Sequence, residues 1–155
     1  MIAVLVALLV VGLIALQVVL LVSAMRTIAR IAFEKAAETL DADLGPTEAE
    51  RFGPAQCLGH DAPGVGSVRG TGALALTADE LRFVLAAPRT RFTIARDDVT
   101  GTEVAAGFRR PGYAQRALRG ELLAVHFTSA GRACVVGFQV RDPHAWAGAL
   151  DRTPI

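Results

Sequence analysis

The chain opens with an unbroken apolar run and continues as a polar sequence in which apolar residues alternate with polar ones. From Ile2 to Val22 the only polar side chain is Gln17, and the first ionisable side chain is Arg26. At about 1.5 Å per residue, a helix of this length spans roughly 30 Å, the thickness of a bilayer's hydrocarbon core. A core helix of a soluble protein would carry a polar stripe, which this run lacks. We therefore expect residues 2–25 to form a transmembrane helix.

The alternative interpretation of this run is a cleaved signal peptide, because residues 22–24 resemble a cleavage site. However, no basic residue precedes the run, and the run exceeds the usual apolar region of about 7–15 residues. Basic side chains follow it instead, at Arg26, Arg30 and Lys35. Positive-inside bias then predicts a single-pass protein of the inner (cytoplasmic) membrane with its C-terminal domain in the cytoplasm.

The next segment, residues 26–50, combines helical periodicity with acidic charge. We expect a juxtamembrane helix followed by an acidic linker, since six of the seven charged residues in 34–50 are Asp or Glu and Gly45-Pro46 should break any helix. Glycine and proline are frequent from Phe52 to Gly72, which predicts a loop. The remaining domain is assigned to residues 51–155.

Apolar residues recur at every second position between Leu74 and Val140, which is typical of half-buried strands. Turn residues separate the sets, as at Asp79-Glu80 and at Ser129-Ala130-Gly131. A polar loop is expected over Gly107–Gly120. The residues predicted to face inward are Leu74, Leu76, Leu81, Phe83, Leu85, Phe92, Ile94, Val104, Ala106, Leu123, Val125, Phe127, Cys134, Val136, Phe138 and Val140.

A short helix is predicted at the C-terminal end. Asp142 suits the N-cap and Pro143 the first helical position, while Trp146 and Leu150 lie four residues apart on one face. Six or seven antiparallel strands followed by such a helix predict a small, partly open barrel whose end the helix covers with Trp146.

This order of elements resembles the pleckstrin-homology-like barrel, and more closely the small bacterial GRAM-like domains. The resemblance is carried by residues 68–77, 81–84, 92–94 and 138–146, and covers about 67–150 without the apolar run. It implies a mainly-β barrel with a C-terminal helix and no shared catalytic residues. Eukaryotic relatives often bind phosphoinositide headgroups, but no lipid-site motif of theirs is matched here.

Catalytic and metal-binding patterns are weak in this chain. His60, His126 and His144 are scattered over a predicted loop, strand and helix start, and Cys57 with His60 lacks a second ligand pair for zinc. The adjacent acids at 97–98 are normal turn formers. We expect no enzyme activity, no metal and no cofactor. The net charge of +1 also argues against nucleic-acid binding.

Arginine provides the main candidate for binding, because residues 51–155 hold 13 Arg against nine acids. Forked guanidinium donors suit phosphate oxygens, and loop aromatics can enter a membrane interface. Arg89, Arg91 and Arg96 would join the same basic face if the hairpins align. The alternative is a solvated arginine-rich loop, since the chain contains 15 Arg and one Lys. The proposed ligand contacts are Arg109, Arg110, Arg116 and Arg119, and the proposed membrane contacts are Phe108 and Tyr113.

These observations favour a membrane-anchored, non-catalytic binding module that recognises anionic lipid or phosphorylated headgroups at the cytoplasmic membrane face. The alternative is a membrane-tethered scaffold that holds a protein partner through a sheet edge or through the acidic 34–50 linker.

Overall fold

The computed structural model describes residues 2–44, 49–110, 113–116 and 120–151 of the chain. It divides into two compact units, Met1–Ile31 and Ala32–Ile155. The second unit therefore begins at Ala32, inside the first helix and earlier than the domain start at residue 51 that we expected from the sequence.

Helix α1 (Ile2–Leu44) carries the apolar run and continues without a break through the juxtamembrane segment. Its stretch Leu9–Leu40 has a mean hydropathy of 2.3 at its most apolar and is long enough to cross a membrane by length and composition. The apolar side chains of residues 9–31 are exposed, as expected for a helix without a polar stripe.

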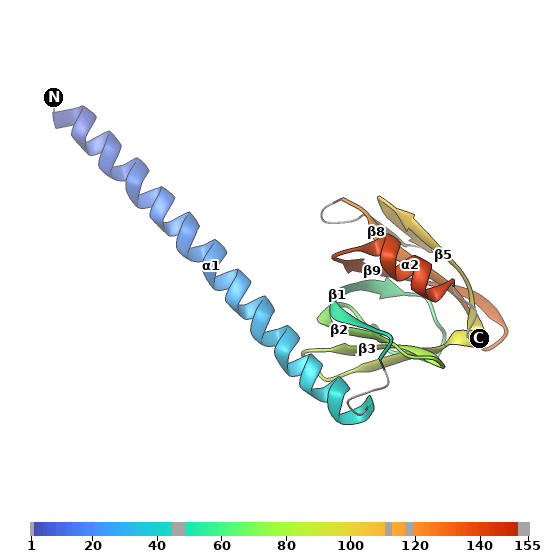
Figure 1. Cartoon of the computed structure of the whole chain (residues 1–155). Helices are drawn as coiled ribbons and strands as arrows, with labels where there is room; N and C mark the ends of the chain where they lie inside the picture. Colours follow the sequence, from blue (N-terminus) through green and yellow to red (C-terminus); the bar gives the residue numbers. More distant parts are fainter. Residues whose placement is uncertain (1, 45–48, 111–112, 117–119, 152–155) are drawn as a thin grey trace. The chain divides into compact units, whose positions relative to one another are not determined.

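A seven-stranded antiparallel sheet forms the body of the second unit, in the spatial order β4-β3-β2-β1-β9-β8-β5, and it curls around a core with helix α2 against its open side (Figure 1). A mainly-β fold of seven strands followed by a short helix confirms the predicted architecture at this level. A separate hairpin pairs β6 with β7. The bounds are β1 Arg51–His60, β2 Gly70–Leu76, β3 Glu80–Leu85, β4 Arg91–Ala95, the 3-10 turn η1 Arg96–Asp98, β5 Val99–Ala105, β6 Gly107–Arg110, β7 Tyr113–Arg116, β8 Leu122–Ser129, β9 Arg132–Val140 and α2 Pro143–Leu150.

Strand β1 corrects the loop predicted for residues 52–72. Pro54 is tolerated because β1 pairs with β9 only from Ala55 onward, so the proline precedes the part of β1 that is paired on both sides. A Cβ added at Gly53 would lie 3.8 Å from the ring of Trp146, at an ordinary contact distance. A central strand thus carries the glycine and proline that made it look like a loop.

The buried core confirms the prediction of which residues on β2, β3, β4, β8 and β9 face inward. Members from each of these strands lie in one buried cluster together with Trp146 and Leu150. Val104, expected inward, is only half-buried on β5, and Ala106 is exposed between β5 and β6. Asp142 caps α2 by accepting a hydrogen bond from the backbone N–H of Ala145 at 3.0 Å, as the sequence predicts.

The outer faces of the sheet are covered at two places. On β2 and β3, Ala73, Ala75 and Val84 pack against Ala36 and Leu40 of α1. A second buried cluster, on the outer side of β1, β8 and β9, lies under the β6–β7 hairpin and comprises Leu58, Phe108, Leu122, Ala124 and Val135. The end of α1 and the hairpin are therefore parts of the folded unit.

Candidate functional site

The segment that holds the predicted arginine cluster is the β6–β7 hairpin, where the sequence predicted a polar loop. Arg109 pairs with Ala114 and Arg110 with Tyr113 in its ladder, while Arg116 pairs with Gly107. The side chain of Arg109 is exposed. Arg119 lies outside the described residues, as do the side chains of Arg110, Tyr113 and Arg116. The hairpin thus brings three of the four arginines into one short ladder.

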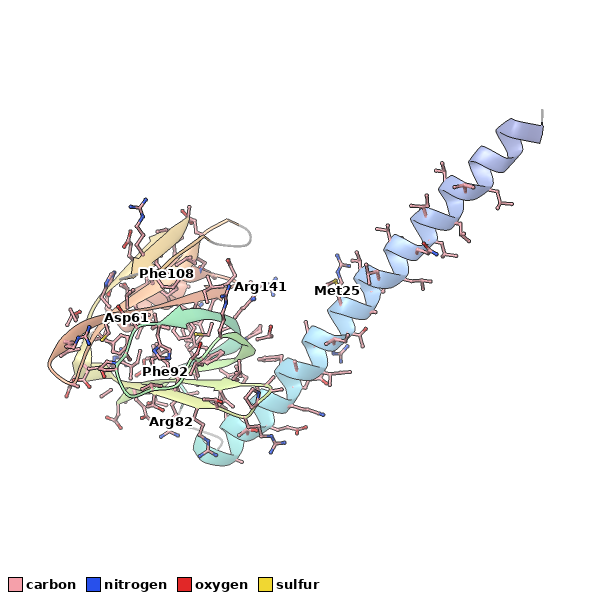
Figure 2. All side chains as sticks on the ribbon, turned by 180° about the vertical axis from the view of Figure 1, so that it is seen from behind. Met25, Asp61, Arg82, Phe92, Phe108 and Arg141 are labelled. Atoms are coloured by element: carbon pink, nitrogen blue, oxygen red, sulfur yellow. The ribbon has the colours of Figure 1, made fainter. Side chains whose placement is uncertain are left out.

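Phe108 corrects the expectation that it contacts a membrane. Its side chain is only 6% exposed and packs in the cluster under the hairpin. It lies over Gly137 of β9, where an added Cβ would overlap the phenyl ring (Figure 2). A glycine inside an otherwise apolar strand often marks such a close approach. Gly137 is therefore the feature of the sequence that could have indicated a buried aromatic side chain here. Phe108 therefore fixes the hairpin to the sheet.

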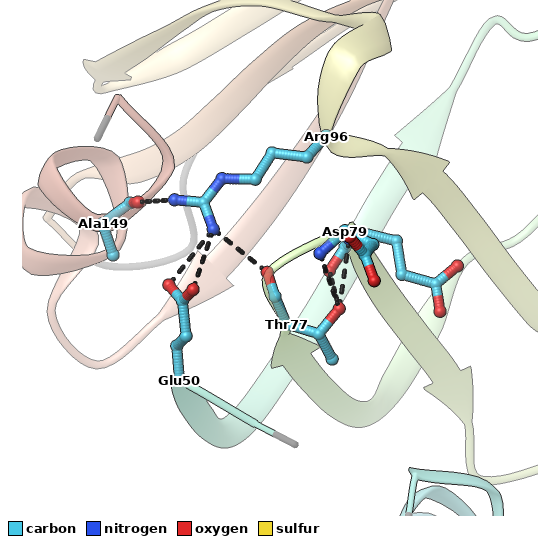
Figure 3. A network of polar contacts seen from close by, with 6 residues as sticks. Glu50, Thr77, Asp79, Arg96 and Ala149 are labelled. Carbon is cyan, nitrogen blue, oxygen red and sulfur yellow. Dashed lines mark hydrogen bonds and ion pairs between the residues drawn. The ribbon is translucent and has the colours of Figure 1, made fainter. Parts of the chain in front are cut away.

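Arg96 is another correction, since it was a candidate for the exposed basic face. It is 8% exposed, and its Nη1 donates to both carboxylate oxygens of Glu50 at 3.1 Å and to the carbonyl oxygen of Thr77 at 3.1 Å. Its Nη2 donates to the carbonyl oxygen of Ala149 at 2.7 Å (Figure 3). This guanidinium joins the start of β1, the end of β2 and the last turn of α2, where a cation also suits the helix dipole.

The turn between β2 and β3 is built around Thr77 in the same network. Its hydroxyl oxygen accepts hydrogen bonds from the backbone N–H groups of Asp79 and Glu80 (Figure 3). The backbone N–H of Arg96 donates to the carbonyl oxygen of Asp79 at 2.7 Å. Arg96 and Thr77 therefore hold the fold together and offer no binding surface.

Arg89 and Arg91 are exposed at the opposite half of the sheet from the hairpin. Arg91 begins β4, and β4 lies four places from β9, over which the hairpin packs. The two arginines line depressions on the outer face of β3 and β4 together with Arg82, Thr90 and Thr93. The basic residues therefore form two separate groups on the unit.

His60, at the end of β1, is 5% exposed and stacks on Phe92 with ring centroids 4.6 Å apart. Its Nδ1 accepts a hydrogen bond from the backbone N–H of Ala62, and its Nε2 lies 3.1 Å from the carbonyl oxygen of Gly66. These contacts are those of a neutral ring that carries its proton on Nε2. The histidine thereby orders the β1–β2 connection over the core.

The two cysteines are free and buried. The Sγ of Cys57 donates to the carbonyl oxygen of Val68 at 3.2 Å, which ties β1 to the end of the same connection. Burial, and then the negative charge of Asp61, raises the pKa of the Cys134 thiol. Within the described ranges, no three His, Cys, Asp or Glu side chains come together as a group that could hold a metal ion.

The other two histidines are paired with acids at the surface. The Nε2 of His126 lies 3.6 Å from a carboxylate oxygen of Glu103, and the Nε2 of His144 lies 3.1 Å from one of Glu121. All four side chains are well exposed to solvent, where such pairs contribute about 0–1 kcal/mol. Both pairs serve as surface contacts between neighbouring elements.

Comparison with protein-family models, with curated proteins and with solved structures finds no match for this chain. The arguments about its function therefore start from its own side chains and their arrangement.

Proposed function

We propose that this protein is a single-pass protein of the inner membrane whose cytoplasmic, pleckstrin-homology-like or GRAM-like domain is a non-catalytic binding module for anionic lipid or phosphorylated headgroups. The apolar helix supports the anchor. The barrel is supported by the seven-stranded sheet, whose spatial order is β4-β3-β2-β1-β9-β8-β5, and by the helix α2 at the C-terminal end. The arginines that follow the apolar run support the orientation.

The observation that carries the proposal is the β6–β7 hairpin. Residues 107–119 contain four arginines and no acid, Arg109 projects into solvent, and Phe108 anchors the opposite side to the sheet. A segment with several guanidinium donors and no acid of its own suits the phosphate oxygens of a membrane surface. Each arginine close to an anionic cytoplasmic leaflet contributes about 1 kcal/mol of attraction.

The test uses the compact fragment 32–155, which keeps the buried part of α1, in sedimentation with vesicles. Replacing Arg109, Arg110, Arg116 and Arg119 with alanine should remove several kcal/mol of affinity for anionic vesicles at low salt, at roughly 1 kcal/mol per arginine. Binding of the parent fragment should also weaken at high salt because the charges are screened.

Two double variants that each remove two arginines provide the matched control. The double variant Arg109→Ala/Arg110→Ala should lose affinity, whereas Arg132→Ala/Arg141→Ala, which removes two exposed arginines outside the hairpin, should bind like the parent. Equal binding of the parent fragment and the four-arginine variant would contradict lipid recognition by the hairpin.

The second candidate function is a membrane-tethered scaffold for a protein partner. It is favoured by the open sheet, in which β4 pairs only with β3 and β5 only with β8 among the described strands. Each edge can accept an added strand. A pull-down from detergent-solubilised membranes should then recover one partner protein. Replacing Thr93 on β4 with proline should abolish that recovery.

A further inference from the structure

Gln17 is the only polar side chain in the apolar run from Ile2 to Val22, and it is exposed on helix α1. It precedes Arg26, the first ionisable side chain, by nine residues, which corresponds to about 13 Å along a helix. With Arg26 at the membrane surface, the amide of Gln17 lies close to the middle of a hydrocarbon core about 30 Å thick. The anchor proposed above therefore holds an amide at a depth where water does not solvate it.

One helix does not satisfy this amide. A glutamine amide offers two N–H donors and a carbonyl oxygen with two lone pairs, while the backbone groups of the surrounding turns already pair within the helix. A short hydroxyl side chain can bond back to its own helix, as Thr27 does by donating to the carbonyl oxygen of Ser23 at 3.0 Å. Gln17 carries more polar atoms, and leaving them unpaired in hydrocarbon is costly. The amide therefore calls for a polar group from a second membrane segment.

Apolar side chains share the helix face of Gln17. Residues at alternating steps of three and four lie on one face of a helix. Together with Gln17 these steps give the Gln17 stripe, which comprises Ile14, Gln17, Leu21, Ala24, Ile28 and Ile31. Ile28 and Ile31 are its informative members, because polar side chains have by then appeared on the helix, at residues 23, 26, 27 and 30, and leave this face apolar. Their side chains are 66% and 47% exposed.

A second copy of the chain matches this stripe. Identical chains insert with the same orientation, so two parallel helices bring Gln17 to the same depth in both copies. The amide is self-complementary, because its N–H can donate to the carbonyl oxygen of the same amide across a two-fold axis, and the reverse bond forms by symmetry. Steps of three and four are also the repeat that keeps one face between two helices as they wrap around each other. A different protein would need a polar group of its own at this depth.

We propose that α1 pairs with α1 of a second copy through the Gln17 stripe, as a parallel dimer in the membrane. This dimer rests on the membrane anchorage proposed above and is independent of lipid recognition by the hairpin. Lipid covers the apolar members of the stripe as well as a helix would, so the amide pair supplies the specificity. The next position of the repeat is Lys35, where two like charges would face each other, so the stripe ends at Ile31.

The experiment uses the full chain in vesicles of phosphatidylcholine, a lipid without net charge. Chains labelled after the C-terminus with donor or acceptor are mixed, and energy transfer is followed as lipid dilutes the protein. Gln17→Leu, which keeps the helix apolar enough to insert, should raise the dissociation constant of the dimer about 3- to 30-fold, equivalent to about 0.6–2 kcal/mol. Gln17→Asn, which keeps an amide, should retain most of the association.

Two double variants test the face of the helix. Ile28→Ala/Ile31→Ala removes apolar side chains from the stripe and should weaken the dimer several-fold. Val19→Ala/Val22→Ala removes exposed apolar side chains from the other side of the same helix and should associate like the parent.

Cysteine cross-linking maps the same face in native membranes. Single cysteines introduced at each position from 13 to 24 should form dimers with yields that peak at residues 14, 17, 21 and 24. The parent, whose two native cysteines are buried, gives the background.

Several outcomes would overturn the proposal. Energy transfer that Gln17→Leu leaves unchanged removes the amide from the interface, and equal cross-linking at every position shows crowding without a defined face. Cross-linking of residue 17 mainly to a different protein makes the partner another chain. A parent that stays monomeric while embedded in the bilayer overturns the dimer and leaves the proposed anchor in place. A chain that carbonate washing releases from native membranes contradicts the anchor itself, and the dimer with it.

Discussion

The docking of the end of α1 on the sheet can be tested at Leu40. Its side chain is fully buried, at 0% exposure, against Ala73, Ala75 and Val84. Removing a buried leucine to alanine costs about 2–5 kcal/mol, depending on how far the site collapses. With a urea dependence of roughly 1–3 kcal/mol per molar, Leu40→Ala should lower the unfolding midpoint of fragment 32–155 by about 1–2 M.

Two optical probes separate loss of the helix from loss of the barrel. Trp146, the chain's only tryptophan, is 4% exposed in the core of the sheet, so its fluorescence follows the barrel. Far-ultraviolet circular dichroism follows the helix. If α1 is an integral part of the unit, both probes should report one shared transition at the lower midpoint.

The matched control is Glu38→Ala, an exposed position on the same helical segment. It should change stability by under about 0.5 kcal/mol. Coincident melts of Leu40→Ala and the parent would refute the reasoning, since a packed leucine cannot be removed without cost. An early loss of dichroism with unchanged fluorescence would show that the helix detaches separately, and would also contradict a single cooperative unit.

The remaining predictions concern the core, a thiol and the topology. Trp146→Ala should lower the stability of the fragment by about 3–5 kcal/mol in a denaturant melt, and coincident curves would make α2 a surface appendage. The pKa of the Cys134 thiol is raised in the folded state, so the protonated thiol contributes to the stability of the fold. This contribution is fully present at pH values below the ordinary thiol pKa of about 8.5 and is lost as the pH rises above it. Stability measured across that range should therefore fall less in Cys134→Ala than in the parent. A reporter fused after Ile155 should be active only if it works in the cytoplasm, and high alkaline phosphatase activity there would reverse the proposed orientation.

Hydrophobic periodicity predicted the core because a strand alternates its two faces and only one face meets the interior. Phe83, Val125 and Phe138, for example, lie in the central cluster as the pattern indicated. Composition was misleading for β1, whose glycines and proline lie in a strand that pairs with β2 and β9. Local composition cannot distinguish a glycine in a strand, whose pairing partners are distant in the sequence, from a glycine in a turn.

The candidate sites also combine features that the sequence predicts with features that depend on distant contacts. The arginine group on residues 109–119 was visible in the sequence, but the hairpin and the inward direction of Phe108 were not. The depressions on the outer face of β3 and β4 were missed because their lining joins two strands with the end of α1. Only the register of β3 against β4 places Arg82 opposite Thr93.

The apolar helix, the alternation of the strands and the capped start of α2 can be predicted from the amino-acid sequence, since each depends on neighbours within a few residues. Which arginines are buried and which are exposed depends instead on contacts between distant parts of the chain. Arg91 and Arg96 stand five residues apart in similar local sequence, yet Arg96 is enclosed by Glu50, 46 residues before it, and by Ala149, 53 residues after it. A guanidinium remains charged at any physiological pH, so it can be buried only where distant parts of the chain supply acceptors for its protons.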